Sequence, residues 1–150
     1  WHTVQIVPHI TWAIKQKVLN AWNSSWADFV IVEIWWTVWD IEWEPFLESI
    51  RQLRLDLWQE NTLFVHLTLL PYLAASKELK TKPTQLSVRD LKRVWIAPDI
   101  ILTRADQRIE KWILKKVAMF CWVDENAVLP METLNSIYKV PLKLEKNWIS

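Results

Sequence analysis

The chain contains no glycine, and this absence limits what it can fold into more than any other feature. Its 150 residues include 13 tryptophans and 0 glycines, whereas about 7% glycine is usual in proteins. Turns with positive φ favour glycine, because any side chain meets the backbone there. Exchanging every tryptophan for glycine would give a glycine content of about 9%, which is ordinary. We therefore interpret the tryptophans as standing where a parent sequence has glycine.

The neighbours of several tryptophans support this interpretation. Trp58 follows the helical run FLESIRQLRLDL, at the place where a glycine ends many helices. Trp95 lies at a helix-to-strand corner, and Trp148 lies in the polar tail EKNWIS. Strained backbone at a non-glycine residue costs about 1–3 kcal/mol, and overpacking typically costs about 1–3 kcal/mol more. We therefore predict that the chain as written does not fold stably.

Length and charge narrow the possible classes of protein. One domain is expected from 150 residues, and 18 basic against 17 acidic residues give no field for nucleic acid or an anionic membrane. Apolar runs such as LFVHLTLLPYLAA are too short to cross a bilayer. The opening WHTVQIVPH has no secretory signal, which favours a cytoplasmic fragment of a longer protein. The single Cys121 predicts a buried, inert thiol.

Apolar runs and amphipathic runs alternate along the chain. We expect strands at 4–8, 27–34, 61–73, 99–104 and 127–130, and helices at 10–22 with Thr11 as N-cap, from Pro45 to 57, at 88–94 with Ser87 as N-cap, and at 107–120, with a turn or helix in ETLNSIY. This order predicts an α/β fold, with a mainly parallel sheet and helices on both faces. Ligands bind beyond the carboxyl ends of such strands. The segments following 27–34, LTLLPYL and DIILTR should therefore share one edge.

The segment VEIWWTVWDIE holds a candidate metal ligand. Glu33 comes one residue before the end of an apolar strand, where burying a carboxylate is costly unless it meets a cation. Magnesium shared with nucleotide phosphates fits one or two carboxylates. A solvated glutamate at the strand end is the alternative. Asp40 and Glu42 precede a helix, where acidic residues are common because of the helix dipole.

The segment Lys80–Gln85, KTKPTQ, is a candidate polyphosphate site. Its two lysines flank a threonine, and Thr84 and Gln85 add uncharged hydrogen-bonding groups. An exposed basic loop without a ligand is the alternative. His66 is expected to be a core histidine with a hydrogen-bond partner, whereas His9 near the sheet edge stays ambiguous.

With glycine in place of tryptophan, VEIWWTVWDIE resembles the EIGGTVGDIE segment of the CTP synthase family, and KTKPTQ is a second signature of that family. The runs VQIVPHIT, HLTLLPYL, APDIILTRAD and NSIYKVP also match in order and spacing. The resemblance covers essentially all 150 residues. It implies the C-terminal half of a P-loop-type synthetase (amidoligase) domain, at residues 1–150, without the P-loop half or the glutaminase domain.

The resemblance also implies an activity. The family uses ATP to phosphorylate the 4-oxygen of UTP, and ammonia released from glutamine displaces the phosphate to give CTP. The implied roles are Mg²⁺ binding by Glu33, catalysis by Lys80 and Lys82, UTP and CTP binding by Asp40, Ile41, Glu42, Lys80, Thr81, Lys82, Pro83, Thr84, Gln85 and Lys116, and ATP binding by Glu132, Thr133 and Leu134. A homotetramer and a glutaminase domain in the same polypeptide are implied partners.

Apart from its tryptophans, the sequence departs from the family pattern at three positions. Leu86 replaces a histidine, and Thr133 and Asn135 replace aspartates, so adenine contacts through the backbone fit better than contacts through side chains. Three loop glycines become Trp35, Trp36 and Trp39. Two other functions stay open: a Trp-rich module that stacks on sugars or lipids, and a non-catalytic assembly fragment.

Overall fold

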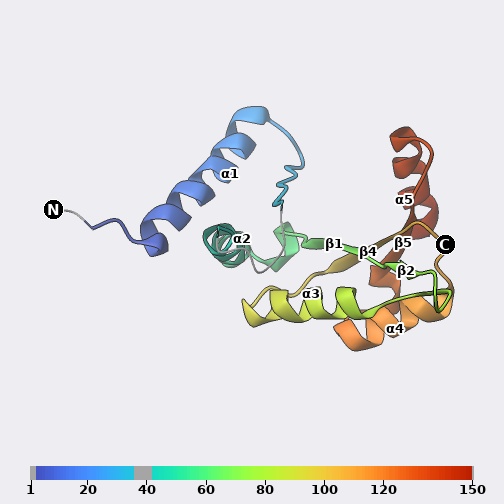
Figure 1. Ribbon diagram of the computed structural model, residues 1–150. Coiled ribbons are helices and arrows are strands. Elements are labelled where there is room, and N and C mark those ends of the chain that lie inside the picture. The colour runs from blue at the N-terminus through green and yellow to red at the C-terminus, as the bar shows by residue number, and fades with distance from the viewer. Residues whose placement is uncertain (1–2, 36–41, 150) are drawn as a thin grey trace. The chain divides into compact units, whose positions relative to one another are not determined.

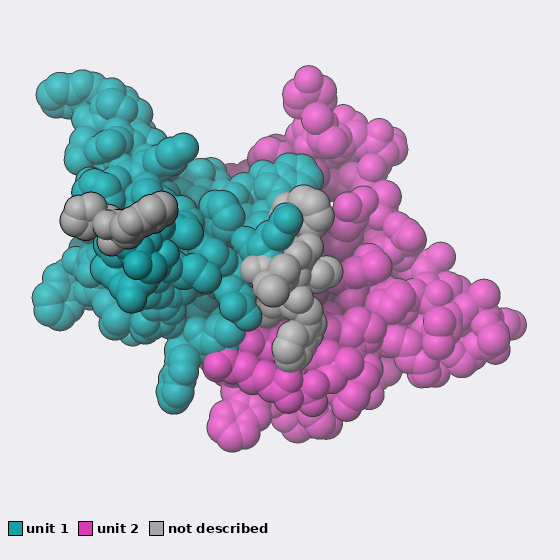
Figure 2. Space-filling view, turned by 60° about the vertical axis from the view of Figure 1, so that its left-hand side comes forward, with its two compact units in different colours: residues 1–62, 94–96 teal, residues 63–93, 97–150 magenta. Residues whose placement is uncertain are grey.

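A computed structural model describes residues 3–35 and 42–149 of the chain (Figure 1). The residues divide into two compact units, which Figure 2 colours separately. Unit 1 comprises residues 1–62 and 94–96, and unit 2 comprises residues 63–93 and 97–150.

Unit 2 is built on a parallel sheet. Its strands are β1 (Val65–Leu69), β4 (Ile100–Ala105) and β5 (Val128–Glu132), in the order β1-β4-β5. Leu67 lies opposite Leu102, and Leu102 lies opposite Leu129. The strands predicted at 99–104 and 127–130 are thereby confirmed, whereas the run predicted at 61–73 contributes only Val65–Leu69 to this sheet. A short antiparallel hairpin, β2 (Tyr72–Leu73) with β3 (Glu78–Leu79), follows β1.

Helices cover both sides of this sheet, as the alternation of patterns predicts. Figure 1 shows α3 (Lys82–Arg93) and α4 (Lys111–Cys121) on one side and α5 (Val140–Ile149) on the other. The core lies between the sheet and the first two helices. It comprises Leu70, Leu79, Val88, Ile101, Ala105, Ile109, Ile113, Val117, Ala118, Cys121 and Val128. The thiol of Cys121 is buried, and burial raises its pKa to about 11, which confirms the prediction of an inert cysteine.

One face of β1 is apolar and exposed. Val65, Leu67 and Leu69 are all solvent-accessible, whereas Thr68 on the opposite face is buried under α3. Within the described residues, β1 pairs only with β4. The apolar run at 61–73 predicts a buried strand, and this prediction is wrong for the face that carries Val65, Leu67 and Leu69.

Unit 1 is helical. Its main elements are α1 (Thr11–Ser25) and α2 (Glu44–Leu57), with the short helical segments η1 (Ile6–Ile10) and η2 (Gln59–Asn61). An ion pair of 2.8 Å joins Lys15 of α1 to Asp56 of α2. Pro45 lies in the first turn of α2, where its missing N–H costs no helical bond, as predicted.

Two predicted strands of unit 1 do not form. The region 4–8 contains part of η1, with its apolar side chains exposed, and the region 27–34 has neither helix nor strand. Phe29 and Ile31 are exposed although their run is apolar. Strands become stable only when a neighbour accepts their backbone hydrogen bonds and covers their apolar side chains. The described part of unit 1 offers no such neighbour.

Two expected helix starts, and the expected backbone at one tryptophan, are also wrong. Thr11 is not the N-cap of α1, because its hydroxyl donates to the Pro8 carbonyl oxygen at 3.1 Å within a preceding helical turn. Ser87 lies inside α3, which begins five residues earlier at Lys82. Trp148, for which the polar tail EKNWIS suggested glycine-like backbone, lies within α5 instead. In each case helical hydrogen bonding extends past a residue that is typical of helix ends.

Tryptophan occupies left-handed or glycine-like backbone at four corners. Positive φ occurs at Trp26 (54°), Trp58 (67°), Trp95 (63°) and Trp122 (57°). This confirms the predictions for Trp58 and Trp95. Their indoles are 96%, 69%, 85% and 86% exposed, so overpacking does not add to the backbone strain there. Replacing these four tryptophans by glycine gives a protein called here the four-glycine variant.

Candidate functional site

The carboxyl ends of the three parallel strands lie at one edge of the sheet in unit 2. Arg104 is the last residue but one of β4, Glu132 is the last residue of β5, and Pro71 lies just beyond β1. The main chain returns to this edge through the β2–β3 hairpin, where the Lys80 amide donates to the Pro71 carbonyl oxygen at 2.9 Å. Two of the three segments predicted to share an edge are therefore together. The third lies in unit 1 and stays a prediction.

The segment Lys80–Gln85 was predicted to be a loop. It leads instead into the first turn of α3. Helical structure begins at Lys82, and the Gln85 amide donates to the Thr81 carbonyl oxygen at 3.1 Å. Pro83 fits the first turn because the N–H that it lacks would have no helical partner there. The amide groups at this helix end and the lysines beside them make the edge electropositive.

The two threonines of this segment point inward. Thr84 is 0% exposed, and its hydroxyl lies 3.1 Å from Thr68 Oγ1 and 3.3 Å from the Leu69 carbonyl oxygen. Thr81 is also buried, and its hydroxyl accepts a hydrogen bond from the side-chain Nε2 of Gln85 at 3.0 Å. These bonds fix α3 to the end of β1. They leave Lys80 partly exposed and Lys82 exposed at the sheet edge.

A carboxylate pairs with one of these lysines. Glu78 of β3 forms an ion pair with the Lys80 ammonium group. The hydrogen bond from Lys80, a second from Ser76, and the positive charges of Lys80 and Lys116 hold the pKa of Glu78 below its usual value. Lys116 lies on α4. The Glu78 carboxylate therefore interacts electrostatically with both Lys80 and Lys116, the two lysines that the family resemblance assigns to UTP or CTP binding.

The segment Glu132–Leu134 closes onto the loop after β4. The Glu132 carboxylate pairs with Lys143 at 2.8 Å and accepts a hydrogen bond from the Ile109 amide at 3.4 Å. Burial alone would raise the pKa of Glu132, but the bonds from Lys143 and the backbone outweigh it and lower this pKa. Thr133 donates to the Asp106 carboxylate at 2.7 Å. Both side chains thus hold the chain in place at this edge.

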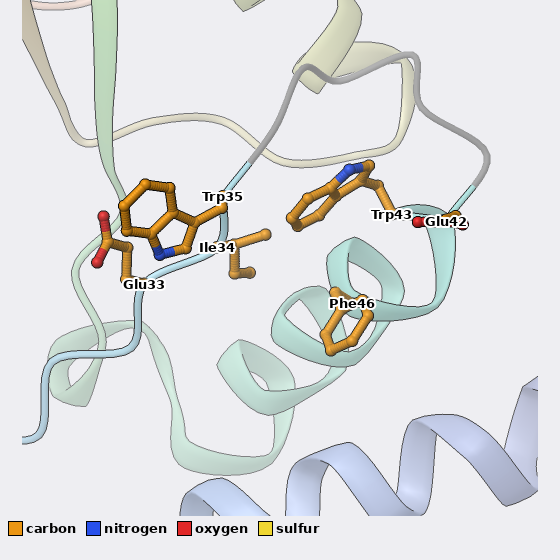
Figure 3. A pocket seen from close by; sticks show the side chains of 6 residues that line it. All are labelled: Glu33, Ile34, Trp35, Glu42, Trp43 and Phe46. Atoms are coloured by element: carbon orange, nitrogen blue, oxygen red, sulfur yellow. The ribbon is translucent and has the colours of Figure 1, made fainter.

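The candidate metal ligand lies in unit 1. Glu33 and Glu42 line a pocket of about 280 Å³ together with Ile34, Trp35, Trp43 and Phe46. Figure 3 shows the indole of Trp35 beside the Glu33 carboxylate, and the two glutamates at opposite sides of the pocket. The rings of Trp43 and Phe46 are 5.7 Å apart. Asp40 and Ile41 lie outside the described residues, as do Trp36 and Trp39.

Residues 3–35 and 42–149 contain neither a cluster of metal-binding side chains nor a membrane-spanning helix. No three His, Cys, Asp or Glu side chains come together there as a metal-binding group. No helix in this part of the chain has the length and apolar character to cross a bilayer. His9 is exposed in unit 1, where its Nδ1 accepts a hydrogen bond from the Gln5 amide at 3.0 Å.

His66 is a core histidine with a partner, as predicted. Its Nε2 lies 2.8 Å from Ser87 Oγ, and burial lowers its pKa from 6.5 to about 4. The unfolded chain therefore binds a proton below pH 6.5 that the folded chain refuses until about pH 4. The contribution of neutral His66 to the free energy of unfolding is fully present above pH 6.5 and is lost as the pH falls to about 4, by about 3 kcal/mol in total.

The unfolding free energy of the four-glycine variant in urea, measured at pH 7.5 and pH 4.5, checks this expectation. Other carboxylates also titrate in this range, so His66→Gln is the matched control. We expect the variant with glutamine to lose clearly less stability on acidification. Equal losses in the two proteins would contradict a neutral, buried His66.

Comparison with known proteins identifies the family. The family model described as CTP synthase N-terminus matches residues 1–150. The chain belongs to the CTP synthase family. It is 51% identical, over 98% of its length, to the CTP synthase of Dehalococcoides mccartyi strain BAV1, and it covers 27% of that protein. The CTP synthase of Symbiobacterium thermophilum is 50% identical over 99% of the chain, with 28% of the relative covered.

The resemblance stated from the EIWWTVWDIE and KTKPTQ segments is thereby confirmed at the level of the CTP synthase family. The chain spans about a quarter of the length of these curated relatives. Sequence reasoning missed Glu78, which pairs with a lysine of the family signature. A strand places residues i and i+2 on the same side, so the pattern Glu-Leu-Lys at 78–80 could have indicated this pair.

Proposed function

We propose that this chain is the C-terminal half of the amidoligase domain of a CTP synthase, which converts UTP to CTP. ATP transfers its γ-phosphoryl group to the uracil 4-oxygen, and ADP leaves. Ammonia from glutamine then forms the new C4–N bond, inorganic phosphate departs with the C4–O bond, and a proton is lost. The single observation that carries the proposal is the cationic end of α3 at the carboxyl edge of the sheet, in a chain of this family.

The triphosphate of UTP is the ligand that suits this edge. Lys80 and Lys82 flank the start of α3, and Lys116 of α4 acts on the same carboxylate as Lys80. Lysine binds phosphate as a point charge, and the first amides of a helix favour an anion. Phosphoryl transfer depends mainly on positioning and on stabilising charge. We therefore assign catalytic roles to Lys80 and Lys82.

The remaining residues of the proposed nucleotide sites follow from this assignment. We propose that UTP or CTP contacts Asp40, Ile41, Glu42, Lys80, Thr81, Lys82, Pro83, Thr84, Gln85 and Lys116, and that ATP lies along Glu132, Thr133 and Leu134. The inward hydroxyls of Thr81 and Thr84 suit shaping of the turn, whereas the lysines face the edge. The bonds of Glu132 and Thr133 to neighbouring elements suit adenine contacts through the backbone.

Magnesium is the proposed metal. Magnesium prefers one or two carboxylates, with phosphate oxygens and waters as its other ligands. Glu33 is an exposed carboxylate in a pocket, so its chemistry fits if nucleotide phosphates supply the remaining oxygens. When bound, the ion would neutralise phosphate charge. A homotetramer, a glutaminase domain in the same polypeptide and a cytoplasmic location complete the proposal.

A chimera tests this function. Residues 1–150 replace the matching segment of the Dehalococcoides mccartyi strain BAV1 CTP synthase, with all 13 tryptophans changed to glycine. We call this protein the reverted chimera. We expect it to form CTP from UTP, ATP and glutamine, monitored by chromatography of the nucleotides. A folded reverted chimera that forms no CTP would refute the proposed function.

A further inference from the structure

The ion pair between Glu78 and Lys80 lies where the proposed function puts a phosphate. Both side chains are partly exposed, at 46% and 39%. Leu79 between them is buried, so the alternation of the strand directs both charged side chains to the opposite, outer side. The carboxylate is therefore held beside the lysine by the course of the backbone.

The β2–β3 hairpin fixes this arrangement. Glu78 lies opposite Leu73 in the hairpin, and the Lys80 amide bonds to the Pro71 carbonyl oxygen at 2.9 Å. Glu78 thus offers Lys80 the same kind of oxygen acceptor, and the same sign of charge, that a phosphate group would offer.

We propose that Glu78 is the internal counter-ion of the triphosphate site, which a nucleotide phosphate must displace from Lys80 on binding. This inference rests on the proposed function, because it assigns the regulation of affinity at that same site. Glu78 keeps the cluster of Lys80, Lys82 and Lys116 partly neutral while no ligand is bound. It therefore lowers the affinity of the site for every polyphosphate that contacts Lys80.

The expected effect of the counter-ion is modest and depends on salt. An exposed ion pair such as Glu78–Lys80 contributes little free energy. Removing the Glu78 charge, which competes with the phosphate for Lys80, should therefore tighten phosphate binding only about two- to fivefold. Charges are screened beyond about 3 Å in 1 M salt and beyond about 10 Å in 0.1 M salt. The gain in affinity should therefore largely disappear at high salt. A side chain that only supports the hairpin would not give this dependence.

Isothermal titration calorimetry of the reverted chimera and its Glu78→Gln variant tests the proposal, with UTP and inorganic triphosphate as ligands in 0.1 M and 1 M salt. We expect Glu78→Gln to bind both ligands about two- to fivefold more tightly in 0.1 M salt only. Glu125→Gln is the matched control, because it removes an exposed carboxylate paired with Lys115 at 3.3 Å. This control should leave both affinities unchanged.

Weaker or unchanged binding by Glu78→Gln would overturn the proposal, since Glu78 would then support the site or have no influence on it. If the reverted chimera binds neither ligand, the proposed function fails and the counter-ion fails with it. Binding by the chimera without a gain in the variant overturns the counter-ion alone. Should Glu78→Gln not fold, Glu78→Ser repeats the test, because it also removes the charge and keeps a small polar side chain.

Discussion

The four-glycine variant is expected to be more stable than the chain as written by about 2–5 kcal/mol. Left-handed backbone costs roughly 1–2 kcal/mol for a residue with a side chain, and Trp58 at φ 67° and ψ 156° lies in a region that is essentially confined to glycine. Each glycine also lowers the stability of the folded chain by about 0.5–1 kcal/mol, because glycine loses more backbone freedom on folding. This cost offsets part of the gain from relieved strain. Four sites together yield the net value.

This difference decides whether the chain folds. Domains are stable by only about 5–15 kcal/mol, and unit 1 has few buried apolar side chains, with Trp43, Leu47 and Leu53 among them. We expect the chain as written to show no cooperative thermal transition above about 45 °C, and the four-glycine variant to show a sharper and higher one. Circular dichroism and urea titration measure both quantities.

Tryptophans within helices supply the matched control. Trp22 is exposed within α1, and Trp112 is exposed in the first turn of α4, where its indole N–H donates to the Glu110 carboxylate. Glycine at these positions should destabilise the chain by about 0.5–1 kcal/mol each, because it adds freedom to the unfolded state without relieving strain. The same substitution thus has opposite signs at corners and in helices. A loss of stability in the four-glycine variant would contradict the explanation by backbone strain.

The sheet of unit 2 could be predicted from the sequence because its strands carry their own pattern. β4 begins with the apolar run Ile100–Leu102, in which Ile100 and Ile101 are buried on opposite faces of the sheet, and the amphipathic run at 107–120 contains most of α4. Such patterns can be read from the spacing of apolar residues within one segment, without knowledge of its distant neighbours. The corners at Trp58 and Trp95 were predictable for a similar reason, since the residues around them mark helix ends.

The errors concern features that depend on distant partners. The apolar run at 27–34 has the composition of a strand, but a strand also needs a neighbour, and composition does not supply one. The start of α3 was missed because Pro83 and two lysines are typical of loops, whereas inward bonds from Thr84 to Thr68 fix them as a helical turn. The partner of Lys80 was missed because it lies outside the six-residue signature.

Replacing Lys80 by alanine in the reverted chimera is expected to reduce kcat/KM for UTP by about 10²–10³-fold. Removing one preorganised charge partner of a reacting group costs this much in well-studied enzymes. Lys115→Ala is the matched control, since Lys115 is an exposed lysine of unit 2 that pairs with Glu125 instead. Initial rates of CTP formation at varied UTP measure the effect. A loss below threefold, or an equal loss in Lys115→Ala, would contradict the assignment of Lys80.

Glu78 gives this prediction a second, sharper part. In Lys80→Ala the Glu78 carboxylate loses its partner lysine, and its charge then faces the incoming phosphates directly. Part of the loss in kcat/KM should therefore come from repulsion, not only from the missing ammonium group. Adding Glu78→Gln to Lys80→Ala removes that repulsion and should recover about two- to fivefold of the activity at 0.1 M salt. A double variant no more active than Lys80→Ala would contradict repulsion by Glu78.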